Sequence, residues 1–259
     1  MIDWLHGLPF IWLVVVVFGA AYLVAAAISW AVLAFAVGER ALAFKAVSPG
    51  MLPPLGLVFG LLVGFLAAQV WNDVGQAQTA VNREASALRA VVLLDASFPG
   101  MPEARMRTLV RRHIEEAANE EWPAMARQHA TLTVVPASLA QALQLALALT
   151  PHSESQKVAQ REIVGALETT LDARRQRIIV SESRITWGKW AGVLLLGALT
   201  MLAIAFVHSD NRATTAIVMG IFASAVAVCL LLIASQDRPF AGPFAVKPDA
   251  LVQVMPGAH

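Results

Sequence analysis

Three side chains that could bind a metal ion fall on one face of an expected helix near the middle of the chain. His113, Glu116 and Glu120 are spaced so that a helix would place an imidazole and two carboxylates on the same side. Such a set could hold a divalent cation. Acidic and basic residues alternate with these three along the whole segment, however, and this is more typical of a solvated charged face. We therefore expect no metal site here.

Motifs of familiar catalytic and cofactor-binding chemistry are absent from the sequence. It contains no GxGxxG or Walker-type phosphate loop, no CxxC pair, no HExxH and no GxSxG. The single cysteine, Cys229, cannot form an intrachain disulfide. Between Asp73 and Lys189, 14 basic residues balance 13 acidic ones, which argues against a nucleic acid as partner. The sequence thus predicts neither an enzyme nor a cofactor.

The apolar segment 51–70 and the residues that follow it have two distinct faces when they are placed on a helix. Gly56, Gly60 and Gly64 repeat every fourth residue and form a narrow stripe for close helix packing. A second stripe lies about 150° away at 100° per residue. It is bulky and apolar first and polar afterwards, and it consists of Phe59, Leu62, Leu66, Gln69, Asp73 and Gln76.

A ring of copies with this second stripe turned inward would make a hydrophobic constriction that opens into a polar vestibule. Such constrictions gate pores by dewetting. We therefore interpret the six residues as pore-lining and the three glycines as helix-packing. The alternative is that the apolar members face lipid and that the polar members only mark the end of a membrane span.

Four uncharged apolar stretches would position these faces in a bilayer. Each reaches or approaches the roughly 20 residues that a membrane-spanning helix needs, and they cover about 10–37, 51–70, 191–207 and 213–234. A hydrophobic content of 58% with only 14% charged residues agrees with a membrane protein. We expect an all-α membrane protein in four parts: a pair of spans in 1–71, a helical domain in 72–187, a second pair in 188–235 and a tail in 236–259.

The distribution of basic residues predicts the orientation of these spans. Four spans place both termini and the central domain on one side, where Arg184, Lys189 and Arg238 lie close to span ends. The two short loops on the other side carry only Arg40, Lys45 and Arg212. We expect a multi-pass protein of the plasma membrane with both termini and the central domain in the cytoplasm. A cleaved signal peptide is disfavoured, because no Lys or Arg precedes Phe10 and the first apolar run is too long.

The central segment has the pattern of four helices. The first continues the second span to about Ser97, and the next two cover about 102–120, ending at Trp122-Pro123, and 136–149. The last begins at Ser153, where Gln156 completes a capping-box pattern, and is expected to run without a break into the third span near Trp187. Two helices would then project rigidly from the bilayer as a stalk.

An apolar seam follows the last of these helices. Val164, Leu171, Ile178 and Ile185 recur every seven residues, with Leu167, Arg174 and Ser181 at the intervening positions. A seam of this kind packs against a partner helix. The partner could belong to the same chain, which we favour, or to another subunit.

Several short motifs along the chain resemble those of the bacterial bestrophin-like proteins, formerly classed as a domain of unknown function. The resemblance covers nearly the whole chain, and its most distinctive parts are Glu121-Trp122-Pro123 and Pro239-Phe240-Ala241-Gly242. The other motifs are Trp71-Asn72-Asp73, Val81-Asn82-Arg83-Glu84-Ala85, Phe98-Pro99, the cluster from Arg174 to Arg177, and Asp237-Arg238.

The resemblance implies four spans, cytoplasmic termini, a helical cytosolic domain, and a pentamer whose second span lines an anion-conducting neck. It implies a neck position for Phe59, Leu62 and Leu66 by their place in the second span. Calcium gating is not implied, because only Asp237 and Asp249 follow the fourth span where bestrophins carry an acidic cluster.

The leading functional hypothesis is a homo-oligomeric channel for small inorganic ions, with five subunits and anions favoured by analogy. Its partners would be the lipid bilayer and further copies of itself. The alternative is a non-conducting membrane scaffold or sensor whose long last helix recruits a cytoplasmic partner.

Overall fold

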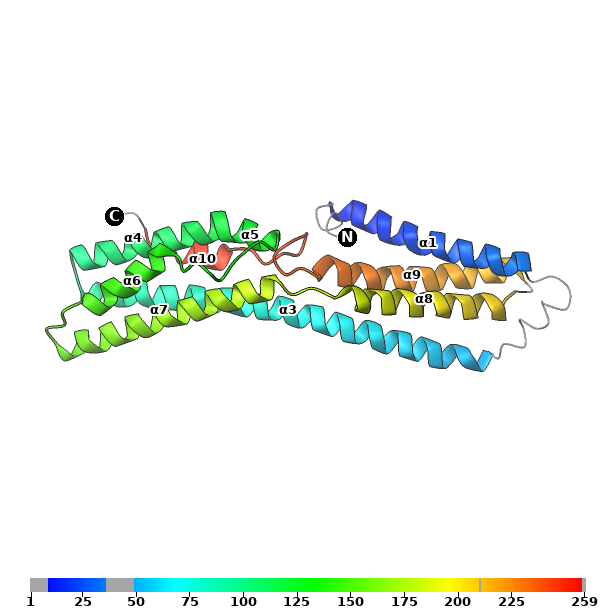
Figure 1. Cartoon of the computed structure of the whole chain (residues 1–259), viewed down its shortest axis with the longest axis horizontal. Helices are drawn as coiled ribbons and strands as arrows, with labels where there is room; N and C mark the ends of the chain where they lie inside the picture. The colour runs from blue at the N-terminus through cyan, green and yellow to red at the C-terminus, as the bar shows by residue number, and fades with distance from the viewer. Residues whose placement is uncertain (1–8, 36–48, 210, 258–259) are drawn as a thin grey trace. The chain divides into compact units, whose positions relative to one another are not determined.

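The computed structural model describes residues 9–35, 49–209 and 211–257, and the regular structure in these ranges is helical throughout (Figure 1). Four helices are long and apolar enough to cross a membrane. They are α1 (Phe10–Phe35), α3 (Leu52–Leu94), α8 (Trp187–Val207) and α9 (Arg212–Gln236). The predicted all-α fold with four spans is confirmed. Val37, Arg40 and Lys45, used above to place the first span and its loop, lie outside the described residues.

The chain divides into two compact units. We call residues 1–71 and 184–237 the membrane unit, and residues 72–183 and 238–259 the polar unit. Helix α3 is a single helix of 43 residues that contributes its first part to the membrane unit and the remainder to the polar unit. Its two parts therefore have different surroundings along one continuous backbone.

In the membrane unit, α1 packs along α9 and also contacts α8 (Figure 1). All four helices contribute apolar side chains to a shared core. Large apolar side chains also cover the outside of these helices, Leu23 and Trp30 of α1 among them. An apolar outer surface is what helices surrounded by lipid require.

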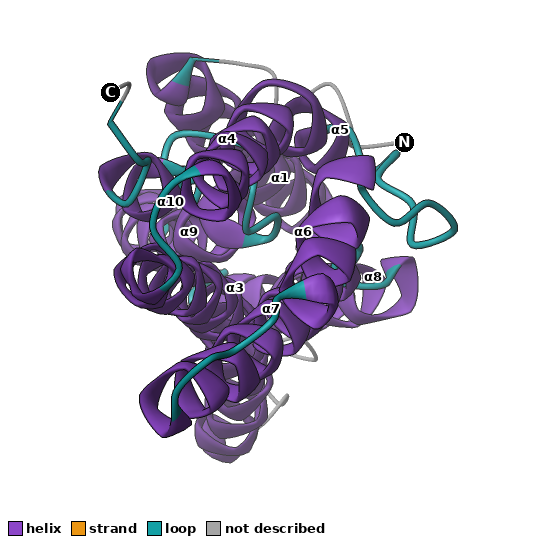
Figure 2. Cartoon of the chain, turned by 90° about the vertical axis from the view of Figure 1, so that its left-hand side faces the viewer, coloured by secondary structure: helices purple, strands orange, loops and turns teal. Residues whose placement is uncertain are grey.

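The polar unit is built from the second part of α3 and further helices that pack with it. They are α4 (Met101–Glu116), a π-helical turn (Ala117–Glu121), α5 (Trp122–Ala126), α6 (Ala137–Ala148), α7 (Glu154–Ser181) and α10 (Asp249–Gln253). A 3-10 turn at Asp95–Ser97 ends α3, and another at Pro49–Met51 precedes it. Helix α6 lies between α4 and α7 (Figure 2). Their buried side chains form one core, to which α3 contributes the completely buried Val81, Leu88 and Val91.

The helix expected to stop at Trp122-Pro123 continues past it, so that prediction is wrong. The chain passes through the π-helical turn, in which the Trp122 backbone N–H bonds to the Ala117 carbonyl oxygen five residues earlier, and α5 then runs to Ala126. Proline lacks a backbone N–H and is tolerated near the start of a helix. The wider turn lets Pro123 occupy such a position without ending the helical path.

The last central helix ends at Ser181 and does not enter α8, so the expected uninterrupted stalk is also wrong. The backbone N–H of Ile185 instead donates to Asp237 Oδ1 at 2.8 Å. Thr186 is extended and precedes the first turn of α8. Residues 182–186 between the two helices include no proline or glycine that would have predicted this break. A hydrogen bond to a residue distant in sequence stabilises it instead.

The predicted start of α7 and its packing within the chain are confirmed. Ser153 Oγ accepts the Gln156 N–H at 3.2 Å, and Gln156 Oε1 accepts the His152 N–H at 2.7 Å. Leu167 and Ile178 of the seam are buried in the core of the polar unit. Along α7 the seam is therefore occupied by helices of its own chain. Ile185 lies beyond the end of α7 and is buried in the core of the membrane unit, so its place in the seam is wrong.

Candidate functional site

The first part of α3 uses one face to pack inside the membrane unit. Phe59 and Leu66 are buried on this face, with Val63 and Val70 beside them. The Phe59 ring lies 5.8 Å from the ring of Phe222 of α9. On α8, a Cβ atom at Gly197 would come within 3.3 Å of Phe59 Cε2. The absence of a side chain at Gly197 therefore makes room for this ring.

The six predicted pore residues differ in their surroundings. Phe59 and Leu66 belong to the packed face, while Leu62 is half-buried beside it. Three polar members continue along the edge of this face: Gln69 accepts a hydrogen bond from Lys189, Asp73 is half-buried, and Gln76 is exposed and accepts a hydrogen bond from Gln176 at 3.4 Å. Within one chain, the two bulkiest buried members have partners and Gln76 faces outward.

The opposite side of the same helix segment has no partner within the described residues. Leu57, Leu61 and Phe65 are exposed by 64%, 53% and 72%. The glycine stripe of Gly56, Gly60 and Gly64 flanks them, and no heavy atom would lie within 4 Å of a Cβ atom at any of these positions. The predicted packing stripe is therefore open in the single chain.

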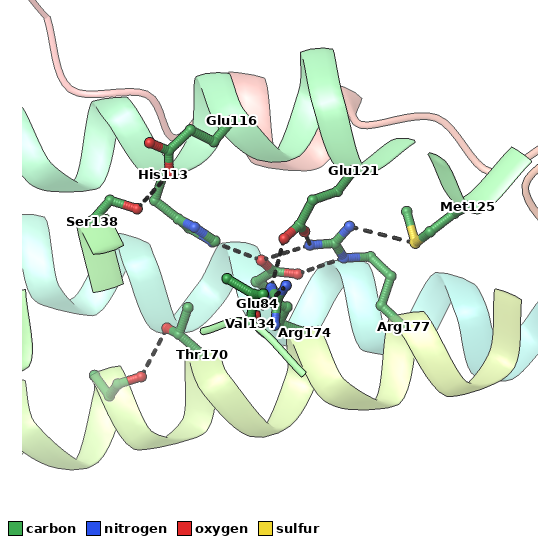
Figure 3. A network of polar contacts seen from close by, with 11 residues as sticks. Glu84, His113, Glu116, Glu121, Met125, Val134, Ser138, Thr170, Arg174 and Arg177 are labelled. Carbon is green, nitrogen blue, oxygen red and sulfur yellow. Dashed lines mark hydrogen bonds and ion pairs between the residues drawn. The ribbon is translucent and has the colours of Figure 1, made fainter. Parts of the chain in front are cut away.

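The second part of α3 carries a charged residue into the core of the polar unit. Glu84 is completely buried, and its carboxylate accepts two hydrogen bonds from the equally buried Arg177 of α7, Nε–Oε2 at 2.8 Å and Nη2–Oε1 at 3.1 Å (Figure 3). His113 of α4 bonds through Nε2 to Oε1 of the same carboxylate at 2.9 Å. Three helices thus converge on one carboxylate.

A second carboxylate from the π-helical turn completes this network. Glu121 accepts hydrogen bonds from Arg177 Nη2 at 2.8 Å and from Arg174 Nε at 2.7 Å (Figure 3). Two guanidinium groups face two carboxylates, so their formal charges balance in a buried place. We refer to Glu84, His113, Glu121, Arg174 and Arg177 as the charge network.

Trp122 connects the charge network to the C-terminal tail. Its ring lies under the guanidinium of Arg177, with 4.4 Å between Cζ and the ring centroid. Its indole N–H donates to the Val246 carbonyl oxygen at 2.9 Å, and Phe240 meets the ring edge-on at 5.8 Å. The tail that follows α9 is therefore fixed to the polar unit through this tryptophan.

The charge network sets the ionisation of its buried members. Burial alone would raise the pKa of Glu84, but the Arg177 guanidinium and the hydrogen bond from His113 outweigh it and lower this pKa from 4.5 to about 2. Burial likewise opposes the charge on Arg177, and Glu84 and Glu121 more than compensate by raising its pKa. Each charge persists because its partners are in place.

His113 does not belong to a solvated face, so that interpretation is corrected. It is completely buried, its Nε2 bonds to the Glu84 carboxylate, and its Nδ1 has no hydrogen-bond partner within the described residues. Glu116 binds Arg112 and Ser138, and Glu120 is exposed. The three side chains do not converge, and the described residues contain no group of three that could hold a metal ion.

Sequence reasoning assigned no role to Glu84, Glu121 or Arg177, although each lies in a motif quoted above. The structure brings separate motifs together: Glu84 of the motif at 81–85, Glu121-Trp122, the arginine pair of α7, and Phe240 of the tail. One signal in the sequence could have indicated the charge network: charged residues stand among apolar ones in helices that are expected to pack. A charge that becomes buried in such a helix requires a partner.

One of three comparisons with known proteins identifies a family for this chain. A family model described as a bestrophin-like domain matches residues 19–251, which cover most of both units and every motif just named. No curated protein and no solved structure gave a significant match. The chain therefore belongs to the bestrophin-like family.

Proposed function

We propose that this protein is a homo-oligomeric ion channel of the plasma membrane, in which the first part of α3 from each copy lines the conduction path. Membership of the bestrophin-like family supports this, because bestrophins are pentamers whose second span lines the neck. The observation that carries the proposal is the unequal use of the faces of α3. One face is filled by α8 and α9, and the face with Leu61 and Phe65 lies open beside a stripe of glycines.

The glycines explain why this open face favours other copies of the chain over lipid alone. In a bilayer, apolar exposure by itself gives no drive for helix association, whereas small residues let helix backbones approach closely and gain van der Waals contact. Gly56, Gly60 and Gly64 offer such a surface, and no described part of the chain occupies it. A ring of α3 helices in contact through their glycines would enclose the remaining open side chains.

The burial of individual residues refines the pore face that the sequence predicted. Leu62, Gln69 and Gln76 lie at the edge of the packed face, and about 100° per residue places Phe65 on the open side next to them. We propose that Phe65 and Leu62 form the apolar constriction and that Gln76 belongs to the polar vestibule. Phe59 and Leu66 retain this role only if the membrane unit repacks in the oligomer.

Orientation and selectivity follow from charge and family. Arg184, Lys189 and Arg238 favour the cytoplasm for the polar unit.

Small inorganic anions are the favoured permeant species, because bestrophins conduct them. Reversal potentials measured across an anion gradient in planar bilayers would test this part separately, and a cation-selective current would refute it while leaving the channel intact.

The number of subunits tests the central proposal first. We expect native mass spectrometry of the protein released from lipid nanodiscs to give a ring, with five copies favoured. A monomer or a dimer would overturn a central pore lined by α3. The scaffold or sensor alternative would then lead, although the α7 seam it relied on is packed within the chain.

Bilayer recordings of two matched phenylalanine variants test the pore face. Phe65→Ala should raise single-channel conductance, because it removes an exposed ring from the proposed constriction. Phe59→Ala removes a ring that packs on Phe222, and we expect it to lower stability without widening the pore. If only Phe59→Ala raised conductance, the face first predicted from the sequence would line the path instead.

A further inference from the structure

An apolar cavity of about 480 Å³ lies within the membrane unit, between α1, α8 and α9. Its walls are aliphatic side chains and small residues, including Ala20 and Ala21 of α1 and Gly197 and Ala198 of α8. Its volume falls within the range of roughly 300 to 1,000 Å³ typical of small-molecule sites. It is separate from the open face of α3 and from the charge network.

One end of the cavity differs from the rest. Trp190 of the first turn of α8 and Asp237, directly after α9, line this end. Tryptophan is enriched where membrane spans meet the interface, and both residues lie at the ends of their spans. The Trp190 indole N–H forms no hydrogen bond within the described part of the chain, so it can donate to an ester or phosphate oxygen.

We propose that this cavity binds one acyl chain of a membrane phospholipid, with the glycerol ester end next to Trp190. The walls belong to candidate membrane spans, so the material around the cavity is hydrocarbon. Water is excluded as occupant because apolar cavities stay dry. An acyl chain is the only apolar molecule that the bilayer supplies in quantity.

The size of the cavity distinguishes an acyl chain from a helix of a neighbouring copy. A spanning helix about 10 Å across and 30 Å long occupies roughly 2,400 Å³, several times the volume available. A slender chain of methylene groups fits where a helix does not. We therefore assign the cavity to an acyl chain and not to a neighbouring helix.

Lipid retention by the full-length protein tests the site. The protein is reconstituted in vesicles of phosphatidylethanolamine and phosphatidylglycerol, extracted with a delipidating detergent, and analysed by native mass spectrometry. We expect one retained phospholipid per chain. Ala198→Phe should reduce retention about tenfold, because its ring would take up space in the cavity and overpack it if lipid were also present. Ala20→Phe fills it from the α1 side and serves if the first variant does not fold.

Ala26→Phe is the matched control, because Ala26 is an exposed alanine of α1 outside the cavity lining. It should retain lipid as the unaltered protein does. Equal retention by all variants, or no retained lipid in any, would refute the site. Because lipid is counted per chain, the result stands whether or not the protein forms a ring or conducts ions.

Discussion

The two parts of helix α3 differ in how their polarity relates to their burial. In the membrane unit the helix is apolar except at Gln69, packs one face through Phe59 and leaves Phe65 and the glycine stripe open. In the polar unit it is mostly polar outside and buries Glu84 completely among charged partners. The part that looks hydrophobic is the less buried one, and the part that looks soluble contains the most buried charge.

This difference indicates where each part obtains its specificity. Hydrogen bonds to Glu84 have defined directions, so the polar unit has one arrangement of α3, α4 and α7. Apolar contacts in lipid have no direction, and the membrane part of α3 relies on shape, as at Gly197 and Phe59. We therefore expect the polar unit to be rigid by itself and the membrane part of α3 to be completed by other copies.

Removing the central cation would break this comparison most strongly. Arg177→Met leaves the Glu84 carboxylate buried without its main partner, which should lower the free energy of unfolding of the polar unit by about 3 to 5 kcal/mol. Hydrogen exchange of α7 in detergent micelles would report the loss. Arg175→Met, at the exposed neighbouring position, is the control and should leave the exchange unchanged. Equal exchange in both variants would mean that the network does not stabilise the unit.

Acid should weaken the polar unit in a defined range. Because the folded-state pKa of Glu84 is lowered from 4.5 to about 2, its contribution is complete above pH 4.5 and disappears as the pH falls towards 2. At about 1.4 kcal/mol per pH unit the loss amounts to about 3 kcal/mol. Urea unfolding at several pH values would measure it, and Glu84→Gln should flatten this part of the profile. An unchanged slope in Glu84→Gln would assign the acid sensitivity to other groups.

A smaller effect would test the connection of the tail to the charge network. Trp122→Phe keeps a ring beside Arg177 and Phe240 but removes the donor to the Val246 carbonyl oxygen. The cost should be about 1 to 2 kcal/mol, because a buried acceptor loses its partner. Thermal melting and proteolysis of the tail would detect it. Trp187→Phe, at an exposed tryptophan, should melt like the unaltered protein; a similar drop there would rule out the tail contact as the cause.

The smallest effect on the single chain, and the sharpest test of the membrane part, is expected at the glycine stripe. A Cβ atom at Gly60 would meet no heavy atom of the described residues within 4 Å, so we expect the thermal midpoint of Gly60→Leu to hardly move. The oligomer should nevertheless dissociate, because close approach of another helix is lost. Native mass spectrometry would measure the number of copies that remain associated. Gly19→Leu, at an equally open glycine of α1, should keep its assembly; dissociation of both variants would remove the special role of α3.

Local pattern determined a large part of this fold. Hydropathy located the four spans, and the capping pattern at Ser153 located the start of α7. Both signals depend on residues close in sequence. The same local reasoning failed at Trp122-Pro123 and between Ser181 and Trp187. There the outcome depended on a π-helical turn and on a bond from Ile185 to Asp237 across 52 residues.

The sequence by itself determined that this chain is a four-span helical protein of the bestrophin-like family with a two-faced second span, because membrane burial requires long runs of apolar residues that can be read directly. Only the tertiary structure decided which face of that span is already filled and that Glu84 and Arg177, 93 residues apart, share a buried site. Helical periodicity defines relative faces but not their partners. From the sequence alone, a charged residue is predicted to be exposed, because a charge can be buried at an acceptable free energy only when it is paired. Its counterion is known only once the fold is known.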